Sequence, residues 1–186
     1  MDSIFLSYRS SDDAYAAALL DTKLSERFGS MEIFRAGRSI PPGIDYASSL
    51  LRSVSNSKVI IAIVGQGWVN SFVKDDSEDW VRMELQEAIG RKIPIIPVLL
   101  ANARRLVESD LPPSLKILAR LQYLRFDYRN IDADSQRIVE ALAQYVFAPQ
   151  SFSSNKNASL STLVEMIERL DARIARIQEK GNSDHG

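Results

Sequence analysis

No cysteine occurs among the 186 residues of the chain, and histidine occurs only once. Without cysteine there is no disulfide framework, no thiolate nucleophile and no cysteine-ligated zinc. The single His185 lies in a polar tail next to the last residue, which argues against a Ser-His-Asp triad and against histidine-based metal clusters. We therefore predict no metal site, and a large part of enzyme chemistry is excluded.

An excess of positive charge and a long apolar run are also missing. The chain has 23 basic and 24 acidic residues, so no positive field attracts nucleic acid or an anionic membrane surface. No apolar run approaches the roughly 18 residues that a membrane span needs, and the start "MDSIFLSY" has no basic leader. We expect a cytoplasmic protein whose partners include neither nucleic acid nor a membrane.

Five short β-rich runs alternate with segments of helical periodicity. The runs at 58–64 and 93–100 are almost continuously apolar, which is typical of central strands covered on both faces of a parallel sheet. The alternation predicts an α/β fold, a flavodoxin-like five-stranded parallel sheet with helices on both faces, over residues 1–147. The expected strands are 3–7, 31–34, 58–64, 93–100 and 122–128, and the expected helices are 12–29, 45–57, 79–89, 111–121 and 134–147.

The C-terminal residues differ in character from the predicted sheet domain. Residues 148–159, "APQSFSSNKNAS", are polar and turn-rich and are interpreted as a linker. A C-terminal helix is predicted over 160–180, followed by a disordered tail over 181–186. The helix self-associates as a short coiled coil, docks on its own domain or binds a foreign partner, and the pattern leaves these three open. Its heptad positions are Leu160, Leu163, Ile167, Leu170, Ile174 and Ile177.

Two phosphate chemistries are disfavoured by the residues at the end of the third expected strand. The "GQG" at 65–67 lacks the third glycine of a dinucleotide fingerprint, and no "GK[ST]" occurs in the chain. A phosphoacceptor domain of the same fold needs an aspartate where this strand ends in "IVGQ". The sequence therefore argues against both a dehydrogenase and a response regulator.

Residues 7–13, "SYRSSDD", follow the first expected strand, where sheets of this type bind ligands. Tyr8 and Arg9 are candidate ligand contacts, because a guanidinium fork suits phosphate or carboxylate. Helix capping is the alternative, and we favour it for Ser11 and the two aspartates; Gly29 is expected to end the helix.

The helix at 79–89 places an ionisable residue at the edge of its apolar stripe. Val81, Leu85 and Ala88 lie on one stripe, and Glu84 lies about 85° from its centre, on the flank of Trp80. We expect Glu84 to be half buried. It either stabilises the helix N-terminus through the dipole or, beside an indole in a cleft, stabilises the oxocarbenium-like charge formed when a glycosidic bond breaks.

Three segments together resemble the Toll/interleukin-1 receptor (TIR) domain family, in the family's order. "IFLSYRSSD" resembles its first box, "IFRAGRSIPPG" its second strand and BB loop, and "DWVRMELQEAIGRKIPIIPVL" the αC helix and fourth strand of its NAD-cleaving members. The resemblance covers about residues 1–147 and implies the TIR fold. It is closest to the bacterial NAD-cleaving, antiphage-defence type.

The resemblance implies an active site around one carboxylate. Glu84 matches the glutamate that NAD-cleaving members require, either as an ionised group that balances the ribosyl cation or as a covalent nucleophile. Many members have an acid where this chain has Ala36, which leaves any substrate contact there open. The expected substrate-binding residues are Tyr8, Arg9, Ser10, Phe34 and Trp80.

The resemblance also implies assembly. In the family the BB loop packs against a neighbouring protomer, and two prolines and two glycines in 35–43 give this loop a stiff path. A plain rigid turn is the alternative. The residues expected to act in assembly are Arg38, Ile40, Pro41, Pro42 and Gly43.

The resulting functional hypothesis is an NAD+ nucleosidase in immune or antiphage signalling. Its products would be nicotinamide and ADP-ribose or a cyclic ADP-ribose isomer that reaches a separate effector, with NAD+ as substrate and no cofactor. A homo-oligomer would form through TIR–TIR contacts and the C-terminal helix. The alternative is a non-enzymatic scaffold that recruits other TIR domains through the BB loop. The sequence leaves the product isomer, the trigger and the oligomer geometry open.

Overall fold

The computed structural model describes residues 3–11, 13–72 and 79–147. These residues belong to the first of two units into which the chain divides, Met1–Ala148 and Pro149–Gly186. The predictions for the linker at 148–159, the helix at 160–180 and the tail at 181–186 lie outside the described residues, as does the capping role of Asp12.

The described residues form one parallel five-stranded sheet with the order β2-β1-β3-β4-β5. This confirms the predicted flavodoxin-like α/β fold. The strands are β1 (Ile4–Ser7), β2 (Ile33–Phe34), β3 (Val59–Val64), β4 (Ile95–Leu100) and β5 (Leu124–Phe126). The helices are α1 (Ala14–Phe28), α2 (Ala36–Ser39), α3 (Tyr46–Asn56), α4 (Trp80–Gly90) and α5 (Ile131–Val146), with 3₁₀ helices η1 (Ser30–Glu32), η2 (Asn70–Phe72), η3 (Glu108–Asp110) and η4 (Pro113–Arg120).

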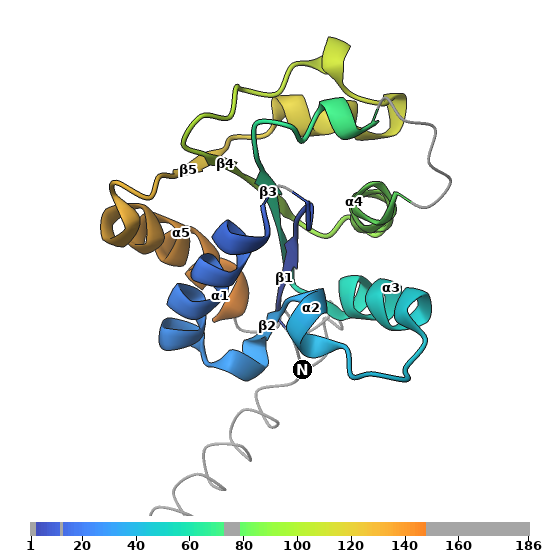
Figure 1. Ribbon diagram of the computed structural model, residues 1–186, viewed down its shortest axis with the longest axis vertical. Helices are drawn as coiled ribbons and strands as arrows, with labels where there is room; N and C mark the ends of the chain where they lie inside the picture. Colours follow the sequence, from blue (N-terminus) through green and yellow to red (C-terminus); the bar gives the residue numbers. More distant parts are fainter. Residues whose placement is uncertain (1–2, 12, 73–78, 148–186) are drawn as a thin grey trace, which may run out of the picture. The chain divides into compact units, whose positions relative to one another are not determined.

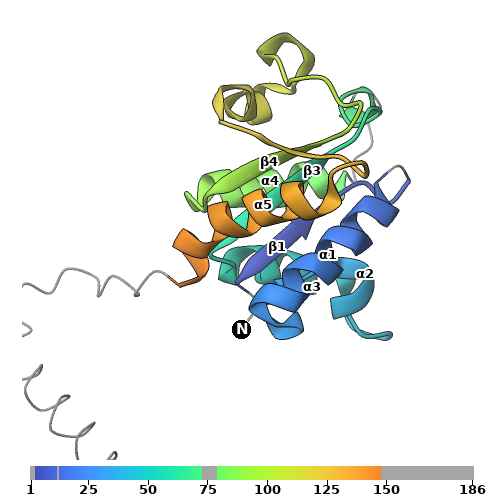
Figure 2. The ribbon, with the colours of Figure 1, turned by 90° about the vertical axis from the view of Figure 1, so that its left-hand side faces the viewer.

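Helices cover both faces of the sheet. In Figure 1, α1 and α5 lie on one side of the strands and α3 and α4 on the other; Figure 2 shows α1 and α5 in front of β1. The residues of β3 therefore alternate between two cores, which explains why the whole strand is apolar. Val59, Ile61 and Ile63 pack in the core of α1 and α5, and Ile60, Ala62 and Val64 pack in the core of α3 and α4.

The same alternation along β1 positions a functional residue. Ile4 and Leu6 face α1 and α5, whereas Phe5 faces α3 and α4. Successive side chains of a strand point to opposite faces, so Ser7 at the end of β1 points to the side of α4. Ligands in sheets of this kind bind beyond the carboxyl ends of the strands, and Ser7 lies at that edge.

The first helix begins later than expected and ends as expected. Asp13 occupies the N-cap position of α1 and Ser11 lies two residues before it, so the prediction that Ser11 caps the helix is wrong. Gly29 ends the helix with a φ of 92° and donates its backbone N–H to the carbonyl oxygen of Ser25. A positive φ is the conformation that favours glycine over residues with a Cβ.

Two segments have other helical forms than expected. Residues 113–120 form a 3₁₀ helix rather than an α-helix, since Leu115 and Leu118 are buried and Leu121 is half buried, a repeat of three that lines one face of a 3₁₀ helix. The expected loop at 35–43 begins with the helical turn α2. Within the ranges that the structure describes, none of the helices has both the length and the apolar character that a bilayer crossing requires.

Truncation of the central strand tests this core. We expect Ile61→Ala to lower the free energy of unfolding by about 2–5 kcal/mol, because Ile61 is fully buried and its loss leaves a cavity. Ile117 on η4 is 44% exposed, so the control Ile117→Ala should change stability by no more than about 0.5 kcal/mol. Urea unfolding measures both, and equal effects would contradict the described packing.

Candidate active site

A buried carboxyl on α4 meets the end of β1. Glu84 is 5% exposed, and the hydroxyl of Ser7 donates a hydrogen bond of 2.6 Å to its Oε2. The expectation of a half-buried Glu84 is therefore wrong. Helical periodicity located the apolar stripe of α4 itself, but α4 also packs over the edge of the sheet, and this contact buries the flank that carries Glu84.

Burial changes the acidity of this group. Removal from water disfavours the charged form and raises the pKa of Glu84 from 4.5 to about 8. The hydrogen bond from Ser7 lowers this pKa, the negative charge of Asp79 raises it, and the positive charge of Arg9 lowers it. Glu84 is therefore mostly protonated at neutral pH in the empty site.

An ion pair holds the start of α4 against the end of β1. The guanidinium of Arg9 lies 2.8 Å from Oδ2 of Asp79, and both side chains are largely buried. Asp79 also caps α4, because its Oδ1 accepts a 3.0 Å hydrogen bond from the backbone N–H of Arg82. The Cζ of Arg9 lies 4.6 Å from the ring centroid of Phe72. Among the described residues, the buried Nε of Arg9 has no hydrogen-bond acceptor.

A pocket of about 300 Å³ opens beside Glu84. It brings together five of the predicted site residues: Tyr8, Arg9, Ser10, Trp80 and Glu84. Phe34 is not among its lining residues, because it stacks on Phe5 in the core at a centroid distance of 5.0 Å and is 2% exposed. The predicted substrate contact of Phe34 therefore has no counterpart in this pocket.

Tyr46 and Asp79 are among the pocket residues that sequence reasoning missed. Tyr46 packs edge-on against Trp80, with ring centroids 5.4 Å apart, and both rings line the pocket. No local pattern links them, because Tyr46 opens α3 and lies far from Trp80 in the sequence. Asp79 was detectable, since an aspartate directly before an apolar periodic segment is a typical N-cap.

Small residues keep one side of the pocket open. Ala36 and Gly37 of α2 line it, and a Cβ placed on Gly37 would lie 3.4 Å from the hydroxyl of Tyr8. Ala36, where the sequence left a substrate contact open, is therefore at the pocket and presents only a methyl group. No group of three potential metal ligands occurs within residues 3–11, 13–72 and 79–147.

The loop at 35–43 is fixed at its base and exposed at its tip. Arg35 and Arg38 pair with the buried Asp21 of α1, at 2.8 and 3.0 Å. Arg38 also donates a 2.6 Å hydrogen bond to the carbonyl oxygen of Ile33, so its guanidinium is engaged within the protomer. Ile40 is half buried against the core. At the tip Pro41, Pro42 and Gly43 are exposed, and Gly43 has a φ of 85°.

The raised pKa of Glu84 has a consequence for stability. A group whose folded pKa exceeds its unfolded value stabilises the fold fully below about pH 4.5, and this contribution is lost as pH rises through about 8. Glutamine keeps an oxygen that can accept the Ser7 hydrogen bond but has no proton to lose. The wild type therefore loses stability as the pH rises from about 4.5 to about 8, and Glu84→Gln does not. We expect the unfolding free energy of Glu84→Gln, measured against that of the wild type, to increase over this pH range by on the order of 4 kcal/mol.

Glu87, one turn further along α4, supplies the control. Hydrogen bonds from Arg91 and Ser55 lower its pKa, so its contribution has the opposite sign and Glu87→Gln should show no gain towards pH 8. Denaturant unfolding at pH 5 and pH 8 measures both variants. A Glu84→Gln variant that follows the wild type at both pH values would contradict the described burial.

Comparison with known proteins identifies relatives of this fold. A family model described as the TIR domain matches residues 4–143. No curated protein matches the sequence. Among solved structures, the TIR domains of the activated Roq1 resistosome, which directly recognises the pathogen effector XopQ, align with a TM-score of 0.57 and 14% identity, covering 76% of this chain and 99% of that chain.

Two animal proteins give similar alignments. The TIR domain of the Toll-related receptor TRR-2 from Hydra magnipapillata has a TM-score of 0.52 and 19% identity, covering 79% of this chain and 99% of that chain. A TIR-STING receptor from C. gigas, in complex with 2',3'-cGAMP, has a TM-score of 0.50 and 24% identity, covering 73% of this chain and 39% of that chain. At these identities the likeness concerns the fold.

Proposed function

Since the chain belongs to the TIR domain family, we propose that it is an NAD+ nucleosidase, an enzyme that cleaves the bond between nicotinamide and ribose. The observation that carries the proposal is the Glu84 carboxyl, which is buried at the wall of an open pocket that Trp80 and Tyr46 also line. A buried acid costs stability, and a role in a reaction gives a reason for keeping it there.

The ribosyl group of the substrate becomes positively charged during the reaction, and a nearby carboxylate stabilises that charge. The bond between nicotinamide N1 and ribose C1′ breaks, both electrons leave with nicotinamide, and the ribosyl group carries the positive charge. An ionised Glu84 stabilises this cation. Water then adds to C1′ and loses a proton to give ADP-ribose, or an adenine nitrogen of the same molecule attacks C1′ to give a cyclic isomer. Glu84 acts either by charge alone or as a covalent nucleophile.

The charge of the substrate explains how a protonated Glu84 becomes active. In the empty pocket the pKa of Glu84 is about 8, so the neutral acid is favoured at neutral pH. NAD+ carries a positive pyridinium ring, and a positive charge close to a carboxyl lowers its pKa. Binding of the substrate would therefore release a proton and leave the carboxylate next to the bond that breaks.

The pocket dimensions favour the nicotinamide riboside end of the substrate. A volume of about 300 Å³ is at the small end of ligand pockets, and the aromatic rings of Trp80 and Tyr46 offer surfaces for the pyridinium ring. The buried Nε of Arg9, without an acceptor in the described ranges, is available to a ligand oxygen. The rest of the dinucleotide would extend beyond the pocket.

A second copy of the chain would complete the site. The exposed tip at Pro41–Gly43 lies on the loop whose first turn, α2, borders the pocket. We propose that TIR–TIR contacts through this tip form a homo-oligomer that encloses the substrate. A cytoplasmic location, a role in immune or antiphage signalling, and a separate effector that responds to the product belong to the same proposal.

The direct test is cleavage of NAD+ by concentrated protein. We expect nicotinamide release that falls by at least about 10²-fold in Glu84→Gln, since electrostatic stabilisation of a developing charge has this magnitude. Glu87→Gln removes a carboxyl from the same helix outside the pocket and should keep the activity. Mass spectrometry identifies nicotinamide and separates ADP-ribose from its cyclic isomers. Equal activity of the two variants would contradict the role of Glu84.

A non-enzymatic scaffold is the second candidate, and the exposed loop tip favours it. In that case TIR domains would bind through Pro41–Gly43 without chemistry. Self-association that is lost in Pro42→His but kept in Glu84→Gln, in protein that leaves NAD+ intact while demonstrably oligomeric, would support the scaffold and overturn the enzyme. Sedimentation and the nicotinamide assay on the same samples distinguish the two.

A further inference from the structure

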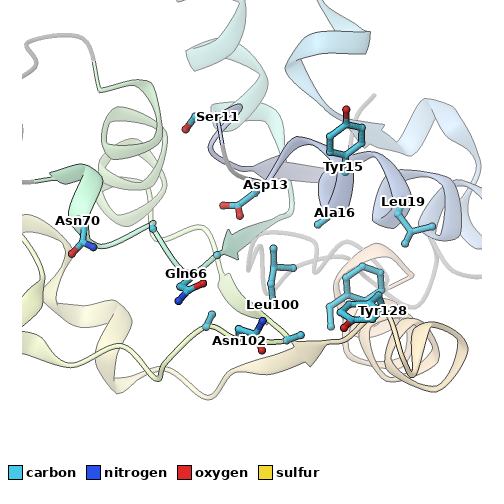
Figure 3. A pocket seen from close by; sticks show the side chains of 15 residues that line it. Ser11, Asp13, Tyr15, Ala16, Leu19, Gln66, Asn70, Leu100, Asn102 and Tyr128 are labelled. Carbon is cyan, nitrogen blue, oxygen red and sulfur yellow. The ribbon is translucent and has the colours of Figure 1, made fainter.

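A second, larger pocket opens at the same edge of the sheet but on the side of α1 and α5. Its volume is about 890 Å³, and it is bordered by the start of α1, the segment after β3, and the ends of β4 and β5. Ser11 is the one residue that it shares with the pocket of Glu84. Figure 3 shows its side chains coming from these separate segments, with the ring of Tyr15 directed away from Gln66 and Asn102. The TIR-type reaction proposed above makes no use of it.

Side-chain amides distinguish this pocket chemically. Gln66, Asn70 and Asn102 line it, and in Figure 3 Gln66 and Asn102 extend from neighbouring segments at its centre. Each amide offers donors and an acceptor side by side, and this pattern matches the edge of a nucleobase. Leu19, Leu100 and Phe126 add apolar surface to the lining.

Two tyrosine rings border the pocket and are open to solvent. Tyr15 is 94% exposed and Tyr128 is 64% exposed, and both line the pocket. A tyrosine ring offers a flat apolar face and a polar hydroxyl group to a ligand. Base stacking on such rings stabilises nucleotide complexes without depending on the identity of the base.

The carboxylate of Asp13 belongs to the lining of this pocket. It lies so close to residue 65 that only a glycine fits there. Asp13 is 2% exposed, and a Cβ placed on Gly65 would lie 1.9 Å from its Oδ1. The close approach of these residues joins the start of α1 to the end of β3.

Two positively charged side chains line a cavity that adjoins the larger pocket. This cavity has a volume of about 350 Å³, shares Gly65, Gln66, Asn70 and Asn102 with the larger pocket, and is lined by Arg104 and Arg105. Guanidinium groups bind phosphate with two parallel hydrogen bonds. The two guanidinium groups outnumber the one carboxylate of this cavity, Asp110, and the shared amides connect them to the aromatic end of the larger pocket.

We propose that the larger pocket and its arginine-lined extension form a nucleotide-binding site, with the base against Gln66 and Asn102 and the phosphates at Arg104 and Arg105. The ligand class is a nucleoside phosphate. The site is separate from Glu84 and goes beyond the proposed cleavage of NAD+, because a nucleotide without nicotinamide satisfies every contact named.

Calorimetric titration of the full chain with ADP, adenosine and inorganic pyrophosphate tests the site. ADP should bind with one molecule per chain, and more tightly than adenosine. Arg104→Ala should weaken ADP by about tenfold or more, as expected for a lost hydrogen bond to a charged group, and leave adenosine unchanged. Asn102→Ala should weaken both ligands. Arg52 on α3 is exposed and lines none of these cavities, so Arg52→Ala is the matched control.

The outcomes separate this site from the pocket of Glu84. We expect Trp80→Ala, checked for folding by circular dichroism, to keep the ADP affinity. Absence of ADP binding at millimolar concentration would overturn the proposal. The proposal would also be overturned if Trp80→Ala abolished ADP binding while Arg104→Ala and Asn102→Ala left it unchanged. ADP contains no nicotinamide bond, so each result stands whether or not the chain cleaves NAD+.

Discussion

A hydrogen bond from Ser7 to Glu84 holds α4 against the carboxyl edge of the sheet and helps to set the position of the pocket. It joins the last residue of β1 to the second turn of α4 at 2.6 Å, inside the protein. Burial of a carboxyl without a partner would be costly, and this bond together with a raised pKa makes the burial tolerable. The ion pair of Arg9 and Asp79 adds a second connection between the same two elements.

These two connections decide where the pocket lies. They hold the N-terminal end of α4 over the carboxyl edge of the sheet, and the pocket occupies the space between α4, the segment after β1 and the start of α3. Trp80 and Tyr46 contact each other across this space. A carboxyl that is neutral when the pocket is empty and ionised beside a cation is suited to a substrate that arrives with a positive ring.

The sequence predicted the fold because its signals are local, and the family resemblance selected five residues that line one pocket of the candidate site. The apolar run of β3 and the spacing of the helices were sufficient for a parallel sheet with covered faces. The burial of Glu84 was not predictable in this way. The periodicity of α4 identifies the apolar side of this helix, but it does not reveal that the flank carrying Glu84 contacts β1. Phe34 was misplaced for a related reason: it lies on the face of α3 and α4 but stacks on Phe5 inside that core, and its position in a motif does not reveal this packing.

The doubly wound topology also explains why two cavities lie at one edge. The chain leaves β1 and β3 towards opposite faces, so a crevice opens on each side of these strands. The crevice facing α4 contains the carboxyl of Glu84, whereas the crevice facing α1 contains three side-chain amides and adjoins a cavity lined by Arg104, Arg105 and Asp110. The segment that carries Ser11 borders both crevices.

Carbon-13 NMR of the glutamate carboxyl groups measures the protonation of Glu84, with Glu84→Gln to assign the signal. We expect Glu84 in the empty protein to titrate with a pKa of about 8. We also expect 1-methylnicotinamide, a pyridinium cation without a glycosidic bond, to lower this pKa. A pKa near the ordinary value of 4.5 in the empty protein, or one that the cation leaves unchanged, would show that Glu84 is not the buried, cation-responsive acid described here.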